Sequence, residues 1–225
     1  MSQITFSERT KQILSNFSKI SPSIFLHEGN ILRTLDSTGG VMAKAVIEED
    51  IPVNFPVGNL KGLLQTINLA TFKNSKIEMD EDKMTLIAGN STLDYYATDE
   101  DSVESIEDDV EPEYDINFTF DIDNETFCDF KSAAKGMGLP YVKIEGKDKV
   151  TMKAFNPDLP TSTVFTITLA DTFDGTPFEV EMKLSNMQSI IDGNYTVKVC
   201  EEDGYNIFTA IDGNLEYIIG HEESL

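Results

Sequence analysis

The sequence is short of the residues that most often mark covalent cross-links or catalytic sites. Its 225 residues include no tryptophan, two histidines and two cysteines, Cys128 and Cys200. Two cysteines cannot cross-link a chain of this length, so we expect a reducing, cytoplasmic environment. No apolar run approaches the about 20 residues that a membrane helix needs, and Met1–Thr10 lacks the apolar core of a secretory signal.

Basic residues are scarce as well. Seventeen lysines and arginines face 40 aspartates and glutamates, which gives a net charge of −23, and the isoelectric point lies near 4.2. On bulk charge alone, nucleic acid is a poor partner for such a chain. Hydrophobic residues make up 40%, enough to bury a core, and the length fits two domains of about 110 residues each.

The residue patterns of common catalytic and metal sites are missing. The two histidines, His27 and His221, stand alone, and the chain has no HExxH, Walker-type phosphate loop or GxSxG elbow. Asp80–Asp82 and Asp121–Glu125 resemble calcium loops, but both lack the glycine and the final glutamate of an EF-hand. We therefore expect no catalytic residue, no cofactor and no metal. An acidic hydrolase with an unrecognised carboxylate site remains an alternative.

The acidic residues concentrate near the middle of the chain. Residues 99–115 read DEDSVESIEDDVEPEYD, with ten acidic residues and no basic one. Such a run repels itself and stays solvated, so we interpret it as a connector between an N-terminal domain at 1–98 and a C-terminal domain at 116–225. The alternative is a long acidic loop within one domain.

Both flanking halves carry many short segments in which apolar and polar residues alternate. This period of two, interrupted by turn residues such as Asp203-Gly204, predicts antiparallel hairpins. One such hairpin is expected around Gly29-Asn30. The expected strands are Ile24–Glu28, Ile31–Asp36, Lys76–Asp80, Met84–Ala88, Ile116–Ile122, Tyr141–Glu145, Lys149–Phe155, Thr163–Leu169, Phe178–Met182, Tyr195–Cys200, Tyr205–Ala210 and Leu215–Ile219.

Four segments have the apolar spacing of short amphipathic helices. In the first, Ile13, Leu14 and Phe17 share a face, and Ser7 can cap the N-terminus. The expected helices are Ser7–Ile20, Asn59–Leu69, Asn124–Met137 and Ser185–Asp192. The fold class is therefore α+β, with few helices and much antiparallel sheet.

The order of these elements repeats at about half the chain length. The approach to the second helix, PVNFPVGNLKGLLQTI, matches PFEVEMKLSNMQSII in layout, and the first hairpin of each half matches similarly. The repeat is one of pattern rather than identity. It predicts two similar domains, each with two short helices packed on antiparallel sheet.

The helices are the only segments with a positive balance. The windows 8–20, 59–71, 124–138 and 183–192 hold seven basic and four acidic residues, which leaves −26 on the rest of the chain. Ordinary solvated helix faces are one interpretation. The other is that the helices face a polyanion through loose, sequence-independent phosphate contacts. On this second interpretation the DNA-binding residues are Arg9, Lys11, Lys19, Lys61, Lys131, Lys135 and Lys183.

Five stretches distributed along nearly the whole chain resemble one known family. They are LSNFSKISPSIFLHEGNILRT (Leu14–Thr34), VNFPVGNLKGLLQTINL (Val53–Leu69), TITLADTFDG (Thr166–Gly175), FEVEMKLSNMQSIIDGNYTVKV (Phe178–Val199) and LEYIIGHEE (Leu215–Glu223). The family is that of DNA sliding clamps, the processivity factors of DNA polymerases. The resemblance is greatest to the clamp of T-even-type bacteriophages.

The resemblance implies a homotrimeric ring with the DNA-clamp fold, helices lining the hole and sheets forming the outer wall. Such a ring encircles double-stranded DNA, tethers the DNA polymerase and is loaded by a separate ATP-dependent clamp loader; it is not an enzyme. Its subunits join head to tail through edge strands. The resemblance places the protein in the cytoplasm of an infected bacterial host.

The family also binds partner peptides beside the connector and the C-terminal tail. By position, the resemblance implies a partner-peptide pocket at Ile106, Val110, Ile219, Gly220 and His221, with late-transcription factors as further candidate partners. Ile106 and Val110 could instead anchor the connector to its own domain. An acidic, β-rich virion or scaffold structural protein is the alternative function.

Overall fold

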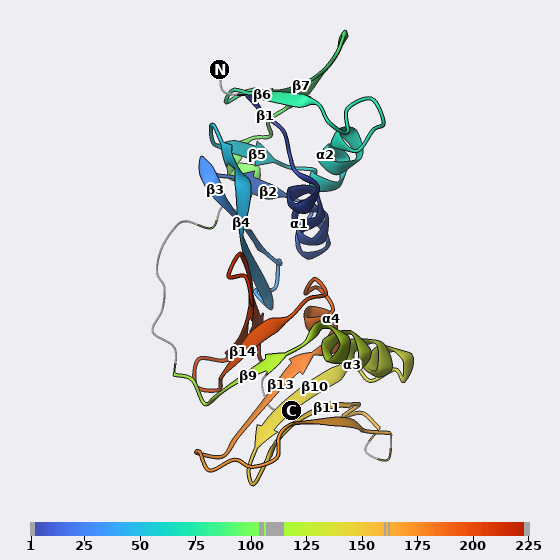
Figure 1. Cartoon of the computed structure of the whole chain (residues 1–225), viewed down its shortest axis with the longest axis vertical. Helices are drawn as coiled ribbons and strands as arrows, with labels where there is room; N and C mark the ends of the chain where they lie inside the picture. The colour runs from blue at the N-terminus through green and yellow to red at the C-terminus, as the bar shows by residue number, and fades with distance from the viewer. Residues whose placement is uncertain (1–2, 104–105, 107–114, 160, 162, 223–225) are drawn as a thin grey trace. The chain divides into compact units, whose positions relative to one another are not determined.

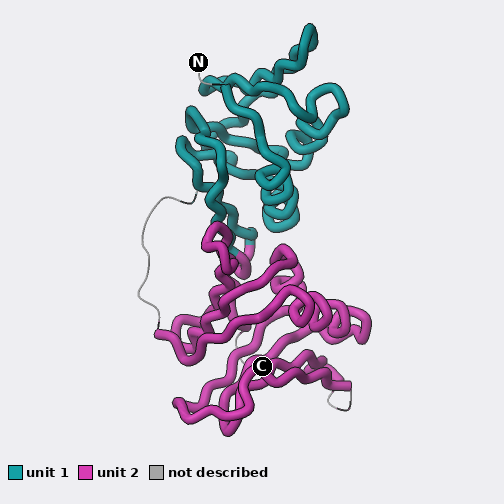
Figure 2. The backbone as a smooth tube through the Cα atoms, viewed as in Figure 1, with its two compact units in different colours: residues 1–37, 42–109 teal, residues 38–41, 110–225 magenta. Residues whose placement is uncertain are grey.

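The computed structural model describes residues 3–103, 106, 115–159, 161 and 163–222. The backbone divides into two compact units, which Figure 2 shows in teal and magenta. Unit 1 comprises residues 1–37 and 42–109, and unit 2 comprises residues 38–41 and 110–225. Each unit has its own helices, sheets and core.

Unit 1 packs two helices beside short antiparallel ladders. The strands β1, β6, β7 and β8 pair in that order, β3 pairs with β4, and β2 pairs with β5. The helices α1 and α2 lie side by side (Figure 1). The elements are β1 (Gln3–Ile4), α1 (Glu8–Ile20), β2 (Ile24–Leu26), β3 (Gly29–Leu35), β4 (Val41–Ile51), β5 (Phe55–Val57), α2 (Leu60–Ile67), β6 (Lys76–Met79), β7 (Lys83–Ala88), β8 (Ser91–Tyr96) and a 3₁₀ turn at Glu100–Ser102.

Unit 2 has helices and strands in the same order as unit 1. One sheet runs β12-β11-β10-β13, and β16, β15, β14 and β9 pair in that order. The helices α3 and α4 contact each other (Figure 1). The elements are β9 (Phe118–Ile122), α3 (Asn124–Gly136), β10 (Tyr141–Gly146), β11 (Val150–Phe155), β12 (Phe165–Ala170), β13 (Phe178–Lys183), α4 (Leu184–Met187), β14 (Tyr195–Cys200), β15 (Tyr205–Ala210) and β16 (Leu215–Gly220).

The two units share one topology. The ladder β1-β6-β7-β8 corresponds to β9-β14-β15-β16, and the pairs β2–β5 and β3–β4 correspond to β10–β13 and β11–β12. A matching backbone hydrogen bond starts the second helix of each unit: Leu60 N donates to Pro22 O at 2.9 Å, and Leu184 N donates to Pro140 O at 2.8 Å. The repeat read from the sequence is thus present in the strand pairing. It also includes β1, a counterpart of β9 that the sequence pattern did not reveal.

Apolar helix faces and alternating strand residues build each core. In unit 1, Leu14 and Phe17 on α1 are fully buried, as are Leu60 and Leu63 on α2. Removing a side chain of this size from such a site typically costs about 2–5 kcal/mol. Unit 2 uses more rings, and Phe127 on α3 lies 5.7 Å from the ring of Tyr195 and 6.0 Å from that of Phe208. These contacts fix which face of each helix remains outside.

Two sequence expectations about the elements are wrong. The segments around Gly29-Asn30 do not form a hairpin ladder, because β2 pairs with β5 and β3 pairs with β4. Strands were expected between this segment and the second helix, but the bounds of the long strand β4 were not predicted. The last helix ends at Met187 rather than Asp192, because Ser189 N and Ile190 N donate to carbonyls three residues earlier, which tightens and ends the turn.

Candidate nucleic-acid interface

The first predicted cluster of cations lies on α1. Ser7 caps this helix, and its hydroxyl accepts a hydrogen bond from Thr10 N at 3.1 Å. Arg9 and Lys19 are exposed. Lys11 is only 6% exposed, and its ammonium donates to Lys73 O and pairs with Glu8 at 3.2 Å. Helical periodicity predicts that Lys11 and Lys19 both lie away from the apolar face of α1. For Lys11 this expectation is wrong, because its side chain is buried as well.

Lys131 on α3 is also buried, at 7% exposure. Its Nζ lies 2.8 Å from Asp192 Oδ1, donates to Ile190 O at 3.1 Å and sits 4.1 Å from the centre of the Phe127 ring. Three partners from the protein thus surround this charge. Lys131 holds α3 against the segment that follows α4, and its ammonium is not presented to solvent as a free cation.

The remaining predicted cations are exposed. Lys61 follows the cap Asn59, whose side chain accepts from Gly62 N at 2.9 Å, and Lys135 lies in the last turn of α3. Lys183 ends β13 and pairs with Glu222 at 2.8 Å. Within the described part of the chain, no ion pair involves the other four exposed residues, which are Arg9, Lys19, Lys61 and Lys135.

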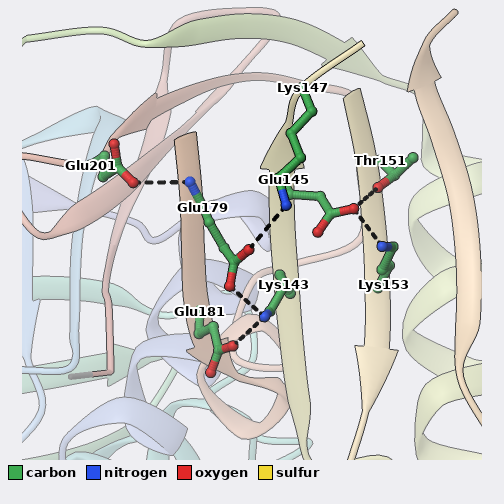
Figure 3. Close-up of polar contacts among 8 residues, drawn as sticks. All are labelled: Lys143, Glu145, Lys147, Thr151, Lys153, Glu179, Glu181 and Glu201. Atoms are coloured by element: carbon green, nitrogen blue, oxygen red, sulfur yellow. Dashed lines mark hydrogen bonds and ion pairs between the residues drawn. The ribbon is translucent and has the colours of Figure 1, made fainter. Parts of the chain in front are cut away.

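In contrast to most of the exposed helical cations, the lysines on one sheet of unit 2 form ion pairs with glutamates (Figure 3). Lys143 on β10 lies 2.6 Å from Glu179 and 2.8 Å from Glu181, both on β13. Partial burial lowers the pKa of Lys143, but the bonds to the two glutamates outweigh burial and raise it. Lys153 pairs with Glu145 (Figure 3), and this hydrogen bond lowers the pKa of the Glu145 carboxyl. The charges on this face neutralise one another.

Lysines without an ion pair also occur outside the helices. Among the described residues, Lys76 and Lys149 are exposed examples, and Lys44 and Lys198 are half-buried ones. Missing ion pairs alone therefore do not mark a DNA-facing surface. What distinguishes the helical cations is that they share short segments with few carboxylates, so that the local field stays positive.

Unit 2 has a pocket that the sequence did not reveal. Its volume is about 400 Å³, and it lies between the end of α3 and the start of α4. Lys135 and Lys183, 48 positions apart in the sequence, both line it. The structure thereby brings two of the predicted DNA-binding residues to one site.

The predicted partner-peptide pocket is only partly supported by exposure. Ile219 is fully buried, so its side chain belongs to the core and is not available to a peptide on the surface. Gly220 N donates to Gly40 O at 3.0 Å, and His221 N donates to Gly204 O at 2.7 Å. Ile106 is half-buried, and Val110 lies outside the described residues.

His221 has an unusual environment. Burial lowers the pKa of its imidazole to about 4. Its Nε2 is buried and has no hydrogen-bond partner among the described residues. The ring is therefore neutral near pH 7, and protonating it would place a charge where the fold offers no acceptor.

Among the described residues, no group of three or more His, Cys, Asp or Glu side chains could hold a metal ion. No helix in the same part of the chain has the length and apolar character needed to cross a bilayer.

Comparisons with known proteins agree with the fold. No protein-family model matches the chain. The crystal structure of proliferating cellular nuclear antigen from Entamoeba histolytica superposes with a TM-score of 0.68 and covers 98% of both chains, at 12% sequence identity. This chain has the DNA-clamp fold. The fold class expected from the sequence is therefore confirmed.

A sequence relative extends the comparison. The sliding clamp of Vibrio phage KVP40 is 28% identical over 223 residues, which cover 96% of this chain and 98% of the phage protein. The resemblance to phage sliding clamps drawn from the sequence is thereby confirmed. Because both chains are covered almost end to end, the likeness extends over both units of the clamp fold.

Proposed function

We propose that this chain is a sliding clamp, a ring that encircles duplex DNA and tethers a replicative DNA polymerase to it. The observation that carries the proposal is the match to the phage sliding clamp along nearly the whole of both chains. The duplicated clamp topology supports it, since similar units can close a ring by rotation. The protein then acts by enclosing DNA and docking partners, not by catalysis.

Charge placement fits this role. Three copies carry three times −23, that is −69, which disfavours binding of DNA to the outside of a ring. The exposed cations on and next to the helices supply the phosphate contacts; they are Arg9, Lys19, Lys61, Lys135 and Lys183. Few contacts are an advantage, because each one increases the free energy needed to slide. Closure of the ring, rather than affinity, keeps the protein on DNA.

Two edge strands are suited to join subunits. Among the described residues, β8 pairs only with β7, and β12 pairs only with β11. Both edges carry exposed apolar residues: Tyr96 on β8 is 67% exposed, and Val164 next to β12 is 54% exposed. We propose that β8 of one subunit pairs with β12 of the next. This head-to-tail contact extends one sheet across the interface and closes a homotrimer.

The partners follow from the same proposal. They are double-stranded DNA, a DNA polymerase, an ATP-dependent clamp loader and, as further candidates, late-transcription factors, in the cytoplasm of an infected bacterial host. Ile106, Val110, Gly220 and His221 remain the candidate partner-peptide residues. The virion-protein alternative lacks a structural feature in its favour, since the fold is that of a clamp.

The decisive test is topological. The protein is loaded onto nicked circular DNA with a loader and polymerase of a related phage, and the circle is then cut once. A ring slides off the new ends, so retention on DNA should fall to background after cutting. Equal retention on circular and linear DNA would contradict the proposal. Cut DNA whose ends are blocked by bound protein provides the control, because a ring stays on it.

A further inference from the structure

The pocket between α3 and α4 has a composition unlike that of the rest of the chain. The residues that line it include two lysines and no carboxylate, although acidic residues outnumber basic ones 40 to 17 in the whole sequence. An anion near most surfaces of this protein meets repulsion, whereas at this pocket it meets the ammonium groups of Lys135 and Lys183, of which Lys183 is also paired with Glu222. The site is therefore electrostatically selected for an anionic ligand.

The two lysines come from different elements, and a backbone hydrogen bond fixes the segments beside them relative to each other. Lys135 lies in the last turn of α3, and Lys183 ends β13. The bond from Leu184 N to Pro140 O fixes the start of α4 against the loop that follows α3. Ser185 and Gln188 add a hydroxyl and an amide to the lining. Ammonium, hydroxyl and amide groups are donors that suit the oxygens of a phosphate.

The remaining wall is apolar and aromatic. Tyr141 on β10 lies directly opposite Lys183 in the antiparallel ladder, so both side chains leave the same face of the sheet. Pro140 and Leu139, the latter only 2% exposed, also line the pocket. A phosphate ion gains nothing from contact with this apolar surface. A sugar and a base can pack on it, because every base has a π-face.

We propose that this pocket binds a nucleoside phosphate, with the phosphate between Lys135 and Lys183 and the nucleoside against Pro140 and Tyr141. A volume of about 400 Å³ lies within the usual range of small-ligand pockets and accommodates one nucleotide. The ligand is either a free nucleotide or the phosphorylated end of a DNA strand. The inference goes beyond encirclement of duplex DNA, since it concerns a saturable site within one unit.

Glu222 pairs with one of the two cations. Its carboxylate lies 2.8 Å from Lys183 Nζ, and its backbone N–H donates to Glu181 O at 2.8 Å, which holds the residue beside β13. The phosphate has to compete with this carboxylate for the ammonium of Lys183. Neutralising Glu222 should therefore strengthen binding rather than weaken it.

The test measures binding of deoxyadenosine monophosphate to the full chain by titration calorimetry at low salt. Lys135→Ala and Lys183→Ala should each weaken binding about tenfold or more, because each removes a charge-assisted hydrogen bond. Lys149→Ala is the matched control, since Lys149 is an exposed lysine of the same unit that lies outside the pocket and outside the proposed DNA-binding set. Glu222→Gln should tighten binding severalfold. Equal losses of affinity in all three lysine variants would show that only the net charge of the protein matters, and would overturn the proposal.

Further titrations examine the two halves of the ligand. Tyr141→Ala should weaken binding of the nucleotide about fivefold or more while leaving inorganic phosphate unchanged. If inorganic phosphate binds as tightly as the nucleotide, the nucleoside part of the proposal is wrong. Competition by an oligonucleotide with a 5′-phosphate, but not by the same oligonucleotide without it, supports a strand end as the source. Binding of the free nucleotide alone supports the metabolite.

These measurements use the protein without a loader or circular DNA. A chain that binds the nucleotide but is retained equally on circular and linear DNA would uphold the pocket and contradict the sliding clamp. A chain that slides off cut DNA but shows no saturable nucleotide binding would uphold the clamp and overturn the pocket.

Discussion

Lys131 and Asp192 form an ion pair in which Nζ lies 2.8 Å from Oδ1, and the two residues differ sharply in exposure. The side chain of Lys131 is 8% exposed, whereas that of Asp192 is 66% exposed. The buried ammonium of Lys131 also donates a hydrogen bond to Ile190 O and lies over the face of the Phe127 ring. The pair joins α3 to the segment after α4, so it stabilises the fold of unit 2.

Replacing Lys131 with methionine should lower the free energy of unfolding by about 2 kcal/mol, because the variant loses charged hydrogen bonds and leaves the Ile190 carbonyl without a donor. Urea unfolding followed by circular dichroism measures the change. Lys135→Met, on the exposed side of the same helix, should stay within about 0.5 kcal/mol of the wild type. Equal midpoints for the two variants would show that the buried pair contributes nothing.

The exposed helical cations should control loading onto DNA. Changing Arg9, Lys19, Lys61 and Lys135 together to glutamate should reduce loading at least tenfold, because phosphate contacts become repulsions. Surface-plasmon or gel-shift assays on nicked circular DNA measure it, with the solution mass checked separately. The control changes Lys44, Lys76, Lys149 and Lys198 to glutamate, which alters net charge equally. Comparable loss in both variants would point to overall charge and not to the helices.

The proposed edge-strand contact can be examined by mass. Light scattering after gel filtration should give three times 25.1 kDa, about 75 kDa. Tyr96→Glu, at the exposed end of β8, should shift the distribution towards 25 kDa at micromolar concentration, because a buried charge at an interface is costly. Ile211→Glu is a matched control at a turn residue that is 60% exposed. A stable dimer of the unaltered chain would exclude the trimer.

His221 should make the protein less stable in mild acid. Its folded-state pKa of about 4 lies below the ordinary value of 6.5, so the unfolded chain binds the proton more tightly. This contribution is complete above about pH 6.5 and is lost as the pH falls towards 4. The loss should be about 2 kcal/mol after allowance for partial exposure.

Comparing the wild type with His221→Phe isolates this effect from the many carboxylates that titrate in the same range. The difference in unfolding free energy between the two proteins should change between pH 7 and pH 4, in favour of the phenylalanine variant. A constant difference over that interval would mean that the imidazole is solvated in the folded state.

The sequence predicts the elements of this fold well where periodicity is strong. The first three helices appear within two residues of their expected ends, because their apolar faces and caps act locally. The bounds of strand β4 were not predicted, although Val41, Ala43, Ala45 and Ile47 alternate inward. Two alanines give a weak hydrophobic signal, and the run Glu48-Glu49-Asp50 resembles a solvated loop. Pairing partners are not local, which is why β2 was expected beside β3.

The candidate site shows the same limit. Helical periodicity places Lys19 correctly on the exposed side, but it misplaced Lys11, which is buried because Lys73 and Glu8 lie beside it. The spacing of residues in the sequence does not predict such contacts. The carbonyl of Lys73 comes from a distant segment, and the contact with Glu8 depends on the side-chain rotamers of both residues. The pocket at Lys135 and Lys183 was invisible for the same reason, since its walls come from four separate elements.

The shared topology of the two units has a consequence for assembly kinetics. A ring of six similar units made from single-unit chains would need six molecules to meet, and its population would fall with the sixth power of concentration. Placing two units in one chain reduces this to the third power and replaces half of the separable joints by covalent bonds. At low protein concentrations, the proposed ring is therefore easier to assemble from such two-unit chains than from their separated halves.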